Sequence, residues 1–165
     1  MTVPRTPSQT VGPFFYFGLC ERPAADLVPG GIRISGRVLD GAGDPVPDAM
    51  VEIWQADERG SYRGDWGWGR CGTDDQGRFS FATVKPGPVG GQAPHLEMLV
   101  FARGLLKHVL TRVYFPDEAA NESDPTLSSV DADDRATLIA AHEDGGYHFD
   151  VRLQGDDQTV FFAVV

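Results

Sequence analysis

Residues 32–54 read IRISGRVLDGAGDPVPDAMVEIW and contain two candidate strands joined by a turn. Apolar and polar side chains alternate from residue 32 to residue 39, and Val51 and Ile53 share one face of the second segment, residues 49–54. The glycines, aspartates and prolines between the two segments are typical of a turn. Short strands separated by turn signals predict a β-sandwich rather than a fold in which helices connect parallel strands.

The rest of the chain continues this pattern of short strands. We expect further strands at residues 78–84, 95–102, 109–115, 147–153 and 159–164, the last two forming a pair around a turn at residues 154–157. One helix is predicted at residues 132–142, because Asp131 can cap its first turn and two further aspartates there suit the helix dipole. The sequence therefore predicts an all-β fold with one short helix.

The length of 165 residues, or 17.9 kDa, suits a single domain over residues 1–165. Within it, residues 1–31 differ from the sandwich at residues 32–165, because they are rich in proline, glycine and aromatic residues. Three prolines among the first thirteen residues disfavour a helix, so an extended N-terminal arm is expected. Residues 14–17 are all aromatic and too apolar for water, so this arm must pack on its own domain or on another chain.

The charge of the chain is strongly negative and unevenly distributed. There are 24 acidic and 14 basic residues, which gives a net charge of -10 and a pI of about 4.7. Residues 1–115 contain 12 acidic and 12 basic groups, whereas residues 116–165 contain 12 acidic groups and only Arg135 and Arg152. We expect the acidic last third to be a solvated outer face. The overall charge argues against nucleic acid or an anionic membrane surface as a partner.

The sequence also carries signals about location and redox state. No stretch is apolar over the roughly 18 residues that a membrane span needs, and the first residues do not resemble a secretory signal, so a cytoplasmic protein is expected. Cys20 and Cys71 are far apart and belong to no Cys-x-x-Cys pair. We expect both to be reduced thiols that are partly buried.

His95 and Glu97 form the first candidate site. They are two residues apart in an expected strand, so their side chains emerge on one face and could share a metal ion, with Tyr62 or His108 as a further ligand. The alternative is a polar pair that faces solvent. The sequence contains no glycine-rich phosphate loop, no Gly-x-Ser-x-Gly motif and no His-Glu-x-x-His motif.

Arginine and tryptophan side chains provide further candidates. Arg103 follows a hydrophobic strand, and its guanidinium could bind a carboxylate in a bidentate fork or form a surface ion pair. Trp66 and Trp68 lie between glycines and could stack on a ligand or cover the core.

Several segments in a fixed order resemble the intradiol ring-cleaving dioxygenases. They are TPSQTVGPF at 6–14, GRVLD at 36–40, VEIWQAD at 51–57, TVKPG at 83–87 and APH at 93–95. FARG at 101–104, TRVYF at 111–115, RLQG at 152–155 and TVFF at 159–162 narrow the resemblance to the alpha chains of the two-chain members. The resemblance covers nearly the whole chain and implies a β-sandwich core of the intradiol dioxygenase type.

The resemblance also implies where iron ligands would lie. Iron-bearing members of the family hold a ferric ion with two tyrosines and two histidines, and phenolates are hard donors that suit ferric iron. The corresponding positions here are Tyr62, Val89, His95 and Glu97, and a family arginine falls on Gln92. Two of the four ligands are therefore replaced. We expect a vestigial site without metal and no catalytic residue in this chain.

The same resemblance implies a partner and a reaction. The alpha chain would form a hetero-oligomer of several alpha-beta protomers with a beta chain that holds the ferric iron and cleaves 3,4-dihydroxybenzoate with O2 to 3-carboxy-cis,cis-muconate. Gly12, Pro13 and Arg103 would line the partner's substrate pocket, and the aromatic residues of the arm would pack on the partner. Two alternatives are a stand-alone enzyme with an altered metal site at Tyr62, His95 and Glu97, and a transthyretin-like β-sandwich that acts as a binding module.

Overall fold

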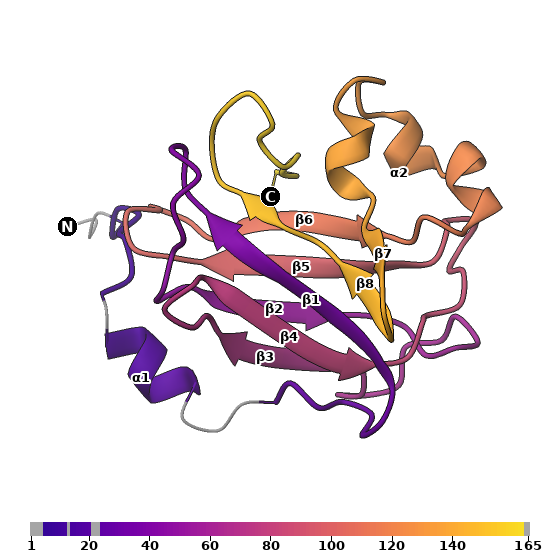
Figure 1. Ribbon diagram of the computed structural model, residues 1–165, viewed down its shortest axis with the longest axis horizontal. Helices are drawn as coiled ribbons and strands as arrows, with labels where there is room; N and C mark the ends of the chain where they lie inside the picture. Colours follow the sequence, from indigo (N-terminus) through magenta and orange to yellow (C-terminus); the bar gives the residue numbers. More distant parts are fainter. Residues whose placement is uncertain (1–4, 13, 21–23, 164–165) are drawn as a thin grey trace.

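Two β-sheets stacked face to face form the centre of the molecule (Figure 1). The computed structural model describes residues 5–12, 14–20 and 24–163. The first sheet is antiparallel and has the order β3 (Trp68–Gly72), β2 (Met50–Trp54), β5 (His95–Phe101) and β6 (Val109–Tyr114). The second has the order β4 (Arg78–Thr83), β1 (Ile32–Leu39), β8 (Gly146–His148) and β7 (Ala141–Glu143), and β9 (Val151–Arg152) also pairs with β1. The predicted all-β sandwich is confirmed.

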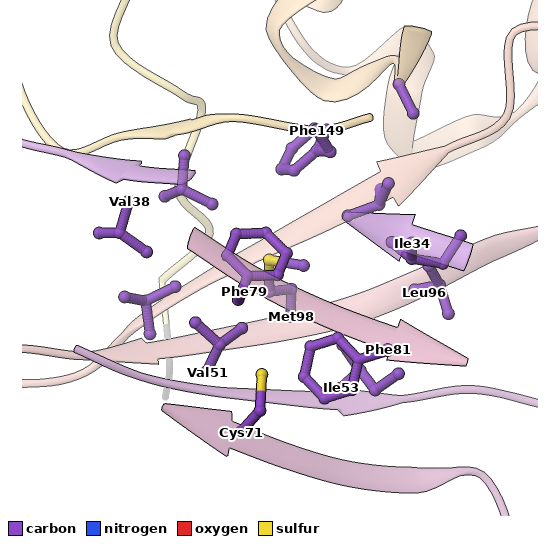
Figure 2. Packing of buried hydrophobic residues seen from close by; sticks show 14 of the residues in the cluster. Ile34, Val38, Val51, Ile53, Cys71, Phe79, Phe81, Leu96, Met98 and Phe149 are labelled. Atoms are coloured by element: carbon purple, nitrogen blue, oxygen red, sulfur yellow. The ribbon is translucent and has the colours of Figure 1, made fainter. Parts of the chain in front are cut away.

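Alternating side chains from both sheets fill the space between them. Val51 and Ile53 of β2 are fully buried, and Phe79 and Phe81 of β4 point into the same layer (Figure 2). Period-two alternation produces this arrangement, because every second residue of a strand faces the partner sheet. The other residues of β5 and β6 point away from the core and form the outer face of the first sheet, where a site can be built.

The close approach of β1 to the last strands depends on Gly36. A Cβ atom at this position would lie 1.8 Å from the carbonyl oxygen of Phe149, which is backbone and cannot move aside easily. Gly36 therefore lets the segment around Phe149 lie directly against β1, between the parallel pairings of β8 and β9.

Two strand predictions were wrong, and two strands, β3 and β7, were missed. The predicted strand at 159–164 is absent from the described residues 159–163, where Phe162 makes only an isolated bridge to Leu110. The predicted strand at 147–153 is broken into β8 and β9. β3 was not predicted, because the glycines around Trp68 suggested a loop. Its pairing with β2 over five residue pairs outweighs that local preference.

The helix predicted at residues 132–142 was also wrong. Only a 3-10 helix, η2 (Arg135–Leu138), forms there, and the chain then extends into β7. Ala140 donates a backbone hydrogen bond to the carbonyl oxygen of Tyr114 at 2.9 Å, and Ile139 bridges the same residue. Pairing with the end of β6 thus outweighs the helical preference of this segment.

Helices appear instead in two places where none was predicted. α1 (Phe14–Cys20) lies within the arm, so the arm is not extended throughout. The three prolines all precede Phe14 and therefore do not interrupt it. The second helix, α2 (Pro125–Ser128), follows the 3-10 helix η1 (Ala119–Ser123). In the described part of the chain, no helix has the length and hydropathy needed to cross a membrane.

The two cysteines are free thiols, as predicted. Cys20 is partly buried, whereas Cys71 is buried in the core. Burial raises the pKa of Cys71 to about 12, so this thiol stays protonated and unreactive at neutral pH.

Candidate functional site

The outer face of the sheet β3-β2-β5-β6 carries a row of side chains from neighbouring strands. Glu97 of β5 lies opposite Trp54 of β2 on one side and Arg112 of β6 on the other. Residues that lie opposite each other in antiparallel strands present their side chains on the same face. His95, two residues before Glu97, is on this face too and lies opposite Tyr114. The prediction that His95 and Glu97 share a face is confirmed.

Tyr62 reaches this face from the loop that follows β2. Asp57 shapes the loop, because its Oδ1 atom accepts hydrogen bonds from the backbone N–H groups of Arg59 and Ser61 at 2.9 Å each. The Tyr62 ring stacks on Trp54, with 5.9 Å between ring centroids and 6° between ring planes. Burial and the negative charge of Glu97 raise the pKa of Tyr62. Its phenol is therefore protonated at neutral pH.

His95 is buried and has a defined tautomer. Its Nδ1 atom lies 2.7 Å from the carbonyl oxygen of Ala93. A carbonyl only accepts hydrogen bonds, so Nδ1 carries the proton and Nε2 the lone pair. Metal-binding histidines use this arrangement, in which the nitrogen away from the metal donates to a backbone carbonyl. Burial lowers the pKa of His95, which favours the neutral ring.

A tight turn brings Val89 and Gln92 beside the same face. Each donates its backbone N–H to the carbonyl of the other, at 3.2 and 2.9 Å. Gly90 and Gly91 between them have φ angles of 58° and 81°, which glycine adopts readily and other residues rarely do. The turn presents the amide of Gln92 to the site, while Val89 contributes a hydrocarbon side chain without a metal-binding atom.

Arg112, which the sequence did not single out as a site residue, is the centre of the cluster. Its Nη2 atom donates to Oε1 of Glu97 at 3.2 Å, and its Nη1 atom donates to Oγ1 of Thr126 at 3.1 Å. A longer contact of 3.4 Å joins Nη1 to Oε1 of Gln92. The side chain is only 16% exposed. One sequence signal could have identified Arg112 as a site residue: it is an arginine in the middle of an expected strand, two residues before Tyr114.

Asp124 connects the cluster to α2. This buried carboxylate accepts hydrogen bonds from the backbone N–H of Leu127 at 2.7 Å, from that of Ala93 at 2.8 Å and from the hydroxyl of Tyr114 at 3.1 Å. It is the N-cap of α2, and Pro125 follows it. An aspartate followed by proline is a recognised helix start, so this signal could have predicted α2.

The four positions that the resemblance assigns to iron ligands do not form a donor set for ferric iron. Val89 has no donor atom, and the Glu97 carboxylate is occupied by Arg112, whose positive charge opposes a second cation. His108, the other suggested ligand, lies against Phe101 at the far end of β5, so it does not join the cluster. Among the described residues, no three His, Cys, Asp or Glu side chains are grouped to hold a metal ion.

Arg103 lies at the opposite end of β5, where the arm that contains Gly12 contacts the neighbouring Gly104. The backbone N–H of Gly104 donates to Oγ1 of Thr10 at 2.9 Å, which joins the arm to the turn between β5 and β6 (Figure 1). Arg103 is six residues beyond Glu97, which corresponds to about 20 Å along an extended chain. The structure thus joins the arm at Thr10, two residues before Gly12, to Gly104, the residue after Arg103, and keeps this end of β5 away from His95 and Glu97. Pro13 lies outside the described residues.

The guanidinium of Arg103 remains accessible. Its Nε atom pairs with Oδ2 of Asp48, and 59% of the side chain is exposed. Because the ion pair uses Nε, the two terminal nitrogens are oriented by Asp48 and remain able to bind a carboxylate. The surface ion pair is therefore confirmed, and carboxylate binding by Arg103 stays a prediction.

The two tryptophans do not cover the core. Trp68 begins β3, is 37% exposed and lies under the guanidinium of Arg70 at 4.9 Å from the ring centroid. Trp66 is partly exposed in the loop before it, and its backbone N–H donates to Arg63 at 3.0 Å. Stacking of either ring on a ligand stays a prediction.

Comparison with known proteins decides the family. The profile of a family described as Dioxygenase matches residues 21–155. The protocatechuate 3,4-dioxygenase alpha chain of Burkholderia cepacia is 43% identical to this chain, and the match covers 99% of each sequence. The chain belongs to the intradiol dioxygenase family. The protocatechuate 3,4-dioxygenase beta chain of Burkholderia cepacia is 33% identical to this chain. That match covers 78% of this chain and 66% of the beta chain.

The architecture also matches that of a solved dioxygenase domain. The dioxygenase domain of a dioxygenase and carbohydrate-binding protein fusion from Streptomyces sp. SirexAA-E aligns with a TM-score of 0.68 and 28% identity. The alignment covers 81% of this chain and 88% of that one. The intradiol dioxygenase family is iron-dependent in general. In this chain, by contrast, the Glu97 carboxylate is paired with Arg112 and Val89 has no donor atom for a metal. An unrelated transthyretin-like binding module is not supported.

Proposed function

We propose that this chain is the non-catalytic alpha subunit of a protocatechuate 3,4-dioxygenase. With a beta-type partner it would support the cleavage of 3,4-dihydroxybenzoate by O2, in which the bond between the two hydroxylated carbons breaks and both oxygen atoms enter the product 3-carboxy-cis,cis-muconate. The observation that carries the proposal is the end-to-end similarity to an alpha chain, combined with ligand positions that do not suit ferric iron.

The ferric ion would belong to the beta-type chain, where it would activate the bound catechol. The chain's own residues support this division. Val89 cannot donate to a metal, and Arg112 holds the carboxylate of Glu97. The altered site at Tyr62, His95 and Glu97 is therefore a weak candidate for independent catalysis.

Arg103 and Gly12 would contribute to the substrate pocket of the partner. Arg103 is mostly exposed at the end of β5 that is remote from the chain's own vestigial site, and the arm that contains Gly12 is joined to the neighbouring Gly104 through Thr10. A guanidinium can pair with the carboxylate of 3,4-dihydroxybenzoate, and glycine lets backbone approach a ligand closely. Pro13 would adjoin them.

The aromatic arm would pack on the partner chain. Tyr16 of α1 faces its own domain, since its hydroxyl donates to the carbonyl oxygen of Thr73 at 3.0 Å. Phe14 and Phe17 on the same helix are 82% and 61% exposed. Exposed aromatic side chains close together are typical of protein interfaces. We propose several alpha-beta protomers per assembly and a cytoplasmic location.

Co-expression with a beta-type chain carrying two tyrosines and two histidines at the ligand positions tests this proposal. We expect the two chains to purify together, to contain about one iron per alpha-beta pair, and to cleave 3,4-dihydroxybenzoate. The isolated chain should contain no stoichiometric iron and show no cleavage. An isolated chain that contained one iron and cleaved the substrate would refute the proposal.

A further inference from the structure

A single cation lies where the vestigial ligand positions converge. The Arg112 guanidinium contacts Glu97 on β5, Gln92 on the tight turn and Thr126 on α2. Glu97 is one of the four positions that the family resemblance assigns to iron, and Gln92 is the position of a family arginine. The guanidinium thus connects β5 with the turn that carries Val89, two of the segments that a metal ion at this site would hold together.

The surroundings of Arg112 suit a permanent positive charge. Glu97 supplies a carboxylate at 3.2 Å, and the ring of Phe162 lies 6.0 Å from the guanidinium carbon. The hydroxyl oxygen of Tyr114 is a longer contact of Arg112 Nη1 at 3.5 Å, and the hydroxyl donates its own hydrogen bond to Oδ1 of Asp124. Burial opposes the charge of Arg112, but hydrogen bonds and charges of Tyr114 and Glu97 outweigh it, and its pKa is raised.

We propose that Arg112 is a built-in cation that takes the place of the ferric ion, and that its guanidinium, together with the lost ligands, keeps metal out of this site. A guanidinium stays protonated under all ordinary conditions, so it cannot yield to a metal by losing a proton as histidine or cysteine can. It also binds one oxygen atom, Oε1, of the Glu97 carboxylate and neutralises its charge. Restoring the ligand residues alone is therefore insufficient to restore iron binding.

The first test compares two variants of the full chain. One carries Val89→Tyr and Glu97→His, which returns the family's ligand types; the other adds Arg112→Gln. Each is incubated with ferrous iron in air and desalted, and its iron content and ferric-phenolate visible absorption are measured. We expect about one iron per chain in the triple variant and at least about tenfold less in the double variant. Equal loading of the two, or no gain in the triple variant, would overturn the proposal.

Arg70 provides a matched control. It pairs with Glu52 across β2 and β3, with its Nε atom 2.7 Å from the carboxylate, and so resembles Arg112 without touching the ligand positions. Adding Arg70→Gln to the double variant makes the same change in net charge. This control variant should bind no more iron than the double variant does.

A second measurement needs no metal and covers the case in which the substituted chains fold poorly. Arg112→Met and Glu97→Gln are made singly and together in the otherwise unchanged chain, and unfolding by urea is followed. Arg112→Met should lower the stability constant about tenfold when Glu97 is present, and about threefold or less beside Glu97→Gln. Additive effects would show that the guanidinium does not act as the counter-charge of this site.

The inference rests on the proposed function only for the assignment of the ligand positions. Both measurements use this chain alone, without substrate or partner. A failure of alpha-beta association would leave the iron and urea results unchanged. Conversely, failure of these two tests would leave co-purification with a beta-type chain unaffected.

Discussion

Asp124 shows how much one buried carboxylate can organise. It is fully buried and has three hydrogen-bond donors, from α2, from the segment before β5 and from β6. A buried charge is tolerated only when its oxygens are well satisfied, and here both oxygens accept hydrogen bonds. Asp124 thereby fixes α2, and with it Thr126, over the outer face of the sheet.

Asp124→Ala should destabilise the protein by about 2–4 kcal/mol, because three donors lose their acceptor and two of them are buried backbone N–H groups. Urea unfolding at pH 7 measures the change. Asp131→Ala removes an exposed carboxylate from a nearby turn and should change stability by less than about 0.5 kcal/mol. Equal effects of the two substitutions would contradict the role given to Asp124.

Arg103→Ala should raise the KM for 3,4-dihydroxybenzoate about tenfold in the alpha-beta complex and affect unsubstituted catechol by less than about twofold, because only the former has a carboxylate. Steady-state kinetics with both substrates measures the difference. Lys107→Ala, an exposed cation on the same connection, is the control and should affect both substrates little. Equal effects of Arg103→Ala on the two substrates would exclude carboxylate binding.

At the scale of elements, the last strands are held to β1 by side chains as well as by backbone pairing. Asp150 lies in the break between β8 and β9 and accepts hydrogen bonds from the backbone N–H of Arg37 at 2.9 Å and from its guanidinium at 3.0 Å. His148 Nε2 lies 2.9 Å from the same carboxylate. Burial acts to raise the pKa of Asp150, but Arg37 and His148 outweigh it and hold the pKa below its usual range.

Asp150→Asn should lower the stability at pH 7 by about 1–2 kcal/mol, and the difference from the unchanged protein should shrink as the pH falls from 5 to 3. A carboxyl with a lowered folded-state pKa stabilises the fold above its unfolded pKa of about 3.9, and this contribution is lost as the pH falls through the folded-state pKa. Urea midpoints at several pH values test this. Asp144→Asn, at an exposed turn, should show no such pH dependence; a constant difference for Asp150→Asn would contradict the assignment.

At this scale, sequence reasoning predicted the elements that depend on local residue patterns and failed for those that depend on long-range pairing. Alternation predicted β1, β2, β4, β5 and β6 because the main core requires it. The helix expected at 132–142 failed because pairing of Ile139 and Ala140 with Tyr114 is a long-range effect. Likewise, the sequence around Trp68 does not indicate that this segment pairs with β2 and becomes strand β3.

At the scale of the whole molecule, the two ends of the β5 strand have different surroundings. One end carries the vestigial cluster around Arg112, covered by α2, and the other carries Arg103 beside the arm (Figure 1). Most acidic residues after Phe115 are exposed, as expected for a solvated face, with Asp124 as the buried exception. The end proposed to face the partner thus lies within the charge-balanced part of the chain.

Deleting residues 1–16 should weaken alpha-beta association by at least about tenfold, because it removes part of an exposed aromatic surface. Analytical ultracentrifugation of the mixed chains measures the effect. Replacing Phe14 and Phe17 with serine leaves Tyr16 in contact with Thr73 and should produce a similar loss while stability changes little. Unchanged association would show that the arm packs only on its own chain.

The sequence by itself determined the sandwich class, the shared face of His95 and Glu97, and the loss of a ligand at Val89. The sandwich class and the shared face depend on residue type and on the two-residue period of a strand, both of which are local, whereas the ligand position at Val89 is assigned by the family resemblance. Only the tertiary structure decided that Arg112 fills the site, that Asp124 fixes α2 above it, and that the arm at Thr10 meets Gly104 beside Arg103. Those outcomes depend on contacts between segments far apart in the chain, which strand pairing and turn geometry bring together only in the folded molecule.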